Sequence, residues 1–204
     1  MLGLQVWASP GWVNLLWLVP IVTFWWFRSK RPQLSGQQLV LLTLFGVAFG
    51  FIEAAVVVYL RAALGLLPGF QGSLADLRHA SSNYQQVNSI SIIPDSLLVI
   101  ERFREAATMV VLVTLSWLSG RGMREKAAVF LWAFATWDLA YYAGLWLTVR
   151  WPSSFRESDV LFLIPQPWIA EVWFPVLVSL TTLIAIFSSR GSTKNNQLSD
   201  LQPK

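Results

Sequence analysis

Five apolar stretches, separated by short polar segments, account for most of the chain; they cover residues 11–27, 39–60, 97–119, 127–149 and 169–188. Each is close to the roughly 20 residues that an α-helix needs to cross the hydrocarbon core of a bilayer. The pattern predicts an all-α fold, a polytopic integral membrane helix bundle with five transmembrane helices. We expect one bundle over residues 1–190, because the apolar stretches leave no room for a separate soluble domain.

The composition favours the same class of protein. Of the 204 residues, 55% are hydrophobic and 13% are charged, whereas a soluble domain has about 25% charged residues. The net charge of +4 comes from short basic clusters beside the apolar stretches. Such clusters are typical of orientation signals in membrane proteins, so we expect no nucleic-acid binding. The sequence contains no cysteine, which excludes disulfides, thiolate metal sites and a cysteine nucleophile.

The basic clusters predict the orientation of the chain. They lie at residues 28–31, 121–126 and 190–194, after the first, third and fifth apolar stretches. Basic segments between spans remain on the cytoplasmic side. We therefore expect the N-terminus outside, outer loops at residues 67–96 and 150–168, and location in a bacterial plasma (inner) membrane. The polar tail, residues 191–204, is predicted to be disordered and cytoplasmic.

Charged residues inside the third apolar stretch are the most informative feature for function. Glu101, Arg104, Glu105 and Thr108 are spaced i, i+3, i+4 and i+7, so they share one helix face. Glu101 would lie about 6 Å and Glu105 about 12 Å below the outer surface, given the helical rise per residue. Charged side chains at such depths usually face a bundle interior or a wet cavity. They form either a self-neutralising pairing within the helix or a functional cluster completed by other helices.

The second apolar stretch carries a carboxylate on a face of small residues. Gly46, Gly50, Glu53 and Ala54 recur at spacings of three and four. The small residues predict close packing against the third or fourth stretch. Glu53 would lie about 21 Å from the inner surface, in the outer half of the bilayer. Arg61 follows on the same face, near the outer surface, where a long side chain can reach the interface.

The fourth and fifth stretches supply two further acids. Asp138 lies near the middle of the fourth stretch, on one face with Tyr141 and Tyr142, and Glu171 opens the fifth. All these acids fall from the midplane outward, which predicts a polar pocket that opens to the outer half of the bilayer. The single histidine, His79, lies in an outer loop and indicates no metal site.

Two functions are compatible with these residues. In the first, the pocket binds or processes an amphipathic lipid-, quinone- or isoprenoid-like molecule, or couples to protons. Arg104 and Arg61 would then hold an anionic head group. We assign proton exchange or catalysis to Glu53, Glu105 and Asp138, and ligand binding to Glu101, Arg104, Arg61, Tyr141, Tyr142 and Glu171. In the second, the chain is a non-catalytic accessory or assembly subunit of a larger membrane complex, and its buried charges fix helix register. No motif indicates a cofactor.

Overall fold

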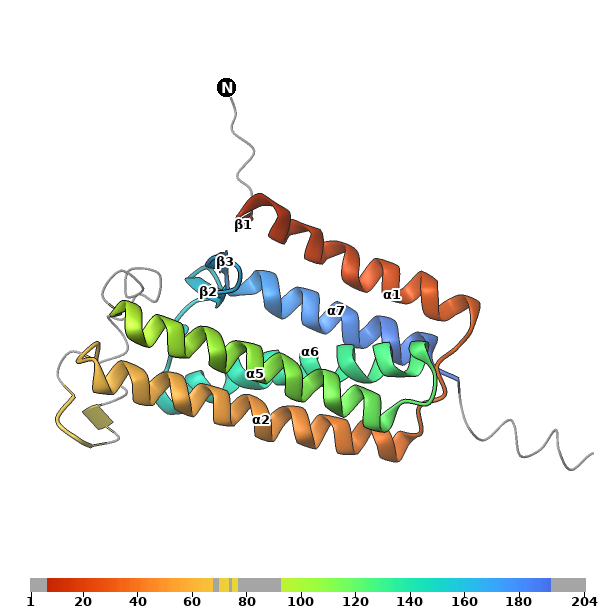
Figure 1. Ribbon diagram of the computed structural model, residues 1–204, viewed down its shortest axis with the longest axis horizontal. Helices are drawn as coiled ribbons and strands as arrows, with labels where there is room; N and C mark the ends of the chain where they lie inside the picture. Colours follow the sequence, from red (N-terminus) through yellow and green to blue (C-terminus); the bar gives the residue numbers. More distant parts are fainter. Residues whose placement is uncertain (1–6, 68–69, 74, 77–92, 192–204) are drawn as a thin grey trace, which may run out of the picture.

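A computed structural model describes residues 7–67, 70–73, 75–76 and 93–191, of which 71% are helical. Five α-helices lie side by side along the long axis of the molecule, with a small sheet at one end (Figure 1). The prediction of a mostly helical chain is confirmed. Most of the predicted outer loop at residues 67–96, including His79, falls outside the described residues, as does the tail from residue 192.

Helices α2 (Gly36–Ala63) and α6 (Met123–Val149) form the centre of the molecule. A capping box between Ser35 and Gln38 starts α2, so the helix begins three residues before the predicted span. A β-carbon at Gly46 would lie 2.8 Å from the β-carbon of Thr136, and one at Gly50 would lie 2.9 Å from the backbone nitrogen of Tyr141. The predicted close packing of this small-residue face is therefore confirmed, and the partner is α6.

The other helices surround this pair. Helix α5 (Asp95–Ser119) packs on α6, and α7 (Trp173–Ser189) packs on both α6 and α1 (Leu18–Ser29). The first apolar stretch begins as a 3₁₀-helix, η1 (Gly11–Trp17), and becomes α-helical at Leu18. Pro20 explains this position, because proline is tolerated in the first turn of an α-helix and not in its interior.

A three-stranded sheet at one end of the bundle corrects the all-α prediction. Strand β3 (Trp168–Glu171) lies between β1 (Ala8–Ser9) and β2 (Ser158–Phe162), and both pairings are antiparallel. The predicted fifth span began at residue 169, but residues up to 171 belong to β3 and the helix begins at Trp173. Pro165 and Pro167 prevent a helix before β3, and pairing on both sides satisfies the backbone of β3.

The opposite end of the bundle joins three basic segments. The guanidinium of Arg124 donates to the carbonyl of Lys30 at 3.2 Å and to Ser29 Oγ at 3.1 Å. The backbone of Gly191 donates to the Pro32 carbonyl at 3.1 Å. The segments that the sequence predicts on one side of a membrane thus meet at one end of the molecule (Figure 1).

Among the described helices, α2 is the one that is long and apolar enough to cross a membrane by itself, and α7 is a shorter apolar helix. Helix α5 has five charged residues in its first eleven positions, and α6 begins with Arg124, Glu125 and Lys126. Charged residues therefore interrupt the apolar sequence at one end of α5 and of α6, whereas α2 has only Glu53 and Arg61 among its 28 residues.

Candidate functional site: a cavity lined by acids and aromatic rings

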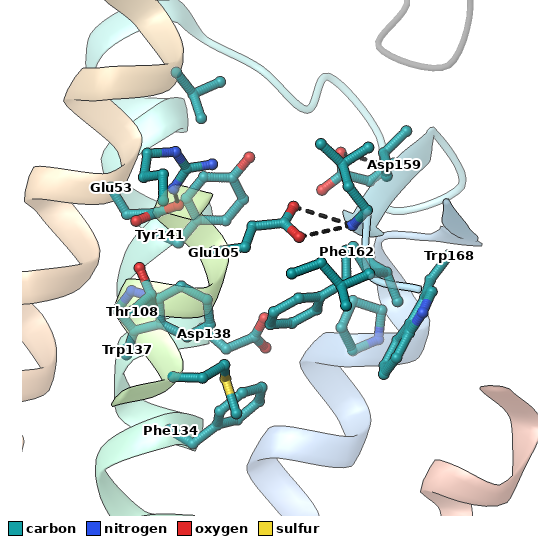
Figure 2. Close-up of a pocket in the computed structure, with 18 of the residues that line it drawn as sticks. Glu53, Glu105, Thr108, Phe134, Trp137, Asp138, Tyr141, Asp159, Phe162 and Trp168 are labelled. Carbon is teal, nitrogen blue, oxygen red and sulfur yellow. Dashed lines mark hydrogen bonds and ion pairs between the residues drawn. The ribbon is translucent and has the colours of Figure 1, made fainter. Parts of the chain in front are cut away.

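A cavity of about 640 Å³ lies between α5, α6 and α7, next to the sheet (Figure 2). Residues from α1, α2 and the segment that follows Asp159 complete its walls. Most of the lining residues are apolar. The polar part contains five carboxylic acids and two arginines: Glu53, Glu101, Glu105, Asp138, Asp159, Arg61 and Arg104.

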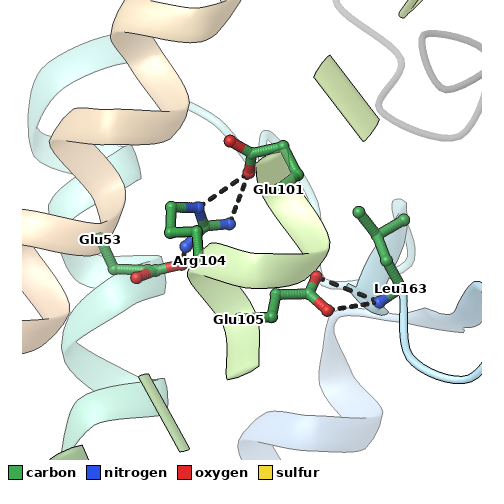
Figure 3. A network of polar contacts seen from close by, with 5 residues as sticks. All are labelled: Glu53, Glu101, Arg104, Glu105 and Leu163. Carbon is green, nitrogen blue, oxygen red and sulfur yellow. Dashed lines mark hydrogen bonds and ion pairs between the residues drawn. The ribbon is translucent and has the colours of Figure 1, made fainter. Parts of the chain in front are cut away.

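Arg104 is the centre of the charged network in this cavity (Figure 3). Its Nε and Nη2 atoms lie 2.8 and 2.7 Å from Oε2 of Glu101, one turn earlier on α5. Its Nη1 atom forms an ion pair with Oε1 of Glu53 on α2. The guanidinium is therefore held between two carboxylates from two helices, and its charge is already compensated within the protein.

Glu105 does not join this network, although it follows Arg104 in the sequence. Its two carboxylate oxygens accept from the backbone N–H of Leu163, at 3.1 and 2.8 Å (Figures 2 and 3). Successive residues on a helix point about 100° apart, so Glu105 faces the segment after β2 while Arg104 faces α2. This carboxylate links the middle of α5 to the chain beside the sheet.

Asp138 is bound by a hydroxyl group. Its Oδ2 atom accepts from Ser179 Oγ of α7 at 2.8 Å. Among the described residues, neither Asp138 nor Glu105 forms a salt bridge. Both carboxylates are therefore hydrogen-bonded to neutral donors, in a wall that is mainly apolar.

A second acid–hydroxyl pair lies at the sheet end of the cavity. Tyr142 of α6 donates through its hydroxyl to Oδ2 of Asp159 at 2.8 Å, and Asp159 is 1% exposed. Arg61, 2% exposed, lies near this pair, with its guanidinium carbon 5.0 Å from the centre of the Trp151 ring. Ring contact of this kind stabilises a buried guanidinium.

Aromatic rings form one continuous part of the wall. The centre of the Phe134 ring lies 5.3 Å from that of Trp137 and 6.4 Å from that of Phe162, and Phe162 lies 5.3 Å from Trp168. All four residues line the cavity (Figure 2). The indole Nε1 atoms of Trp137 and Trp168 are buried, and no described residue accepts a hydrogen bond from them. Trp137 as a whole is only 7% exposed.

The structure brings eight of the nine sequence-predicted site residues to one cavity: Glu53, Arg61, Glu101, Arg104, Glu105, Asp138, Tyr141 and Tyr142. Glu171 does not line it. That residue lies in β3 and accepts from the indole N–H of Trp173 at 2.6 Å. Its position in a strand, and not at the start of a helix, turns it away from the cavity.

The polar groups of the site that were not predicted from the sequence include Asp159, Ser179 and the indole N–H groups of Trp137 and Trp168. Asp159 lies in a predicted outer loop, and its burial depends on the hairpin of β2 and β3. Ser179 lies in an apolar stretch, where a hydroxyl gives no signal of its own. Trp137 precedes Asp138 directly, and tryptophans are frequent throughout this sequence.

The arrangement suits the binding of an organic molecule with an apolar and a polar part. Within the part of the chain that the structure describes, no group of three or more His, Cys, Asp or Glu residues is placed to hold a metal ion. The apolar wall can enclose a hydrocarbon chain, and the acids, hydroxyls and indole N–H groups can contact a polar head.

No protein-family model, curated protein or solved structure matches this chain.

Proposed function

We propose that this chain is a five-span membrane protein, with the N-terminus outside and the C-terminal side cytoplasmic. Its cavity binds an amphipathic lipid- or isoprenoid-like molecule. The observation that carries the proposal is the cavity itself, about 640 Å³, which combines an apolar wall with a charged network from α2 and α5. Ligand sites are typically concave, mostly apolar and fitted with a few converging polar groups.

The exterior of the helices supports insertion in a membrane. The outward faces of α1, α2, α5 and α7 expose large apolar side chains, which on α2 are Val40, Leu41, Leu44, Val47, Phe51 and Ile52. Soluble proteins rarely expose contiguous apolar surface of this extent, because such surface drives aggregation in water. In a bilayer the same faces contact lipid tails.

The basic end of the bundle supports the orientation. Arg28, Lys30, Arg31, Arg121 and Arg124 belong to connections at the end opposite the sheet. The positive-inside rule assigns that end to the cytoplasm. On this orientation the sheet and the cavity beside it lie toward the outer side.

The buried carboxylates provide the groups for proton exchange. Asp138 and Glu105 are each held by a neutral donor and line the same cavity. A positioned carboxylate within hydrogen-bond reach of a ligand can act as a general acid or base. The proposed function therefore includes acid–base chemistry on the bound molecule or coupling to protons.

One pair of adjacent alanines allows a direct test. Both side chains are exposed, but Ala106 lines the cavity and its neighbour Ala107 does not. The protein is purified in lipid nanodiscs, extracted with organic solvent, and the extract is analysed by mass spectrometry for a component in stoichiometric amount. We expect Ala106→Trp to lose this component and Ala107→Trp to retain it. An equal yield from both variants would mean that the component is bound on the outer surface and not in the cavity.

A second candidate function rests on the Arg104 network. Both carboxylates that contact Arg104 come from the protein, and the pair with Glu53 joins α5 to α2. Buried ion pairs can serve to fix one helix register, as an accessory or assembly subunit of a larger complex requires. This alternative predicts that the natively purified protein carries a partner polypeptide and no stoichiometric small molecule.

A further inference from the structure

The chemistry of the polar part of the ligand can be inferred in part from two buried indole N–H groups in the cavity wall. Trp137 and Trp168 both line the cavity, and neither Nε1 atom has an acceptor among the described residues. Phe162 contacts both rings, at centre distances of 6.4 and 5.3 Å, so the two indoles belong to one wall. A buried donor without an acceptor is costly, and a ligand oxygen beside this wall would remove the cost.

The carboxylates of the same cavity require hydrogen-bond donors from a ligand, whereas the indoles require acceptors. Within the part of the chain that the structure describes, Glu105 accepts only from the Leu163 backbone and Asp138 only from Ser179. A carboxyl group offers about four acceptor positions. Each of these two acids can thus accept further hydrogen bonds from a ligand that reaches it.

An anionic head group does not fit this arrangement. The guanidinium of Arg104 is already held between Glu53 and Glu101, and five acids line the cavity against two arginines. A phosphate or carboxylate ligand would face an excess of like charge, which disfavours binding. The role that the sequence suggested for Arg104, to hold an anionic head group, is therefore replaced by a structural one.

A cationic head group would satisfy the carboxylates of the wall but not the indole N–H groups. An ammonium ion would donate to Glu105 and Asp138, but it has no lone pair for an indole N–H. A hydroxyl group has one donor and two acceptor positions. Several hydroxyls on one head group could therefore satisfy the carboxylates and the indoles together.

Building on the proposed binding of an amphipathic molecule, we infer that the ligand of this cavity carries a neutral polyhydroxylated head group, such as a sugar. Its hydroxyls donate to Glu105 and Asp138. They accept from Trp137 Nε1 and Trp168 Nε1 once a small turn of each ring brings these buried atoms to the cavity surface. The apolar tail lies along the remaining hydrocarbon wall, which includes Val57, Leu60 and Met109.

Three probes that differ only in the head group can test this inference. Each has the same dodecyl tail with a diazirine near its end, and the heads are glucoside, primary ammonium and phosphate. The full chain is placed in phosphatidylcholine nanodiscs, the probes are photolysed, and labelled peptides are located by mass spectrometry. We expect the glucoside to label residues of the tail wall, such as Leu60 and Met109, most strongly. Excess unlabelled dodecyl glucoside should suppress this labelling.

Single substitutions then isolate the indole N–H. Trp137→Phe keeps an aromatic ring but removes the donor, so the glucoside should bind about fivefold more weakly, as for the loss of one hydrogen bond. Trp25→Phe, on the exposed face of α1, is the matched control and should have no effect. Trp168→Phe gives a second test if the Trp137 variant does not fold.

The outcomes distinguish the polyol assignment from the proposed binding of an amphiphile. Stronger cavity labelling by the ammonium or phosphate probe, or equal glucoside binding by the Trp137 and Trp25 variants, would overturn the polyol assignment and leave amphiphile binding in place. If none of the three probes labels the cavity of the folded protein, the proposed binding function fails and this inference fails with it.

Discussion

At the scale of single residues, Arg104 determines how the buried charges are balanced. Its guanidinium contacts Glu101 on its own helix and Glu53 on α2. Removal of one member of a buried charge network leaves the other charges uncompensated. The resulting loss of stability is larger than the net contribution of the ion pair to stability.

We therefore expect Arg104→Leu to destabilise the protein by about 3 kcal/mol. Arg102→Leu is the control, because Arg102 is exposed and does not line the cavity; it should change stability little. Thermal unfolding of both variants in the same detergent measures the difference. Coincident transitions would show that the network does not hold α5 against α2.

The partners of the individual acids could be predicted only in part. The Arg104–Glu101 contact follows from the i, i+3 spacing within one helix, and the shared face of Glu101, Arg104, Glu105 and Thr108 is confirmed, since all four line the cavity. The separation of Glu105 from Arg104 depends on where Leu163 presents its backbone N–H. The sequence gives no indication of that position, because Leu163 follows a strand that is too short to be recognised.

At the scale of elements, Glu105 connects α5 to the chain beside the sheet. Glu105→Leu removes the acceptor of the Leu163 N–H, and we expect faster deuterium exchange of this amide with little change at the Trp168–Glu171 strand. Glu105→Gln retains a carbonyl acceptor and should preserve most of the protection. Unchanged exchange in the leucine variant would mean that this contact does not order the segment.

Among the described elements, the most extensive helix contact is the one between α2 and α6. An alanine at an interior helix position normally replaces glycine with a gain of about 1 kcal/mol. At Gly50 the added β-carbon would lie 2.9 Å from the backbone nitrogen of Tyr141, so we expect Gly50→Ala to destabilise the protein. Gly36→Ala meets nothing within 4 Å and should be neutral or stabilising. Melting temperatures of the two variants in one detergent provide the comparison.

The helices were predictable and the sheet was not, for a physical reason. Long apolar runs with small residues at regular spacing identify α2 and its packing face directly. The strands have two to five residues, and the pairing of β1 with β3 joins segments about 160 residues apart in the sequence. Short apolar pieces between prolines are equally compatible with an interfacial loop, so the ends of the first and fifth stretches could not be assigned from the sequence alone.

At the scale of the whole molecule, the proposed orientation can be tested on a background without native cysteines. Ser154, exposed in the segment before β2, and Arg121, exposed at the basic end, are suitable positions. We expect Ser154→Cys to react with an impermeant thiol reagent in intact cells, and Arg121→Cys to react only after permeabilisation. The reverse pattern would invert the orientation.

The packing of α1 on α7 has a consequence for the order in which the molecule can be assembled. The ribosome completes α1 about 140 residues before it reaches α7, and β1 must likewise wait for β3. During this interval α1 lacks its principal neighbour, and in the proposed membrane only its apolar surface is available to hold it in place. Contacts between segments so distant in sequence slow folding, so we expect docking of α1 to be a late, post-translational step. A chain that stops before α7 would leave α1 open to capture by membrane quality-control factors.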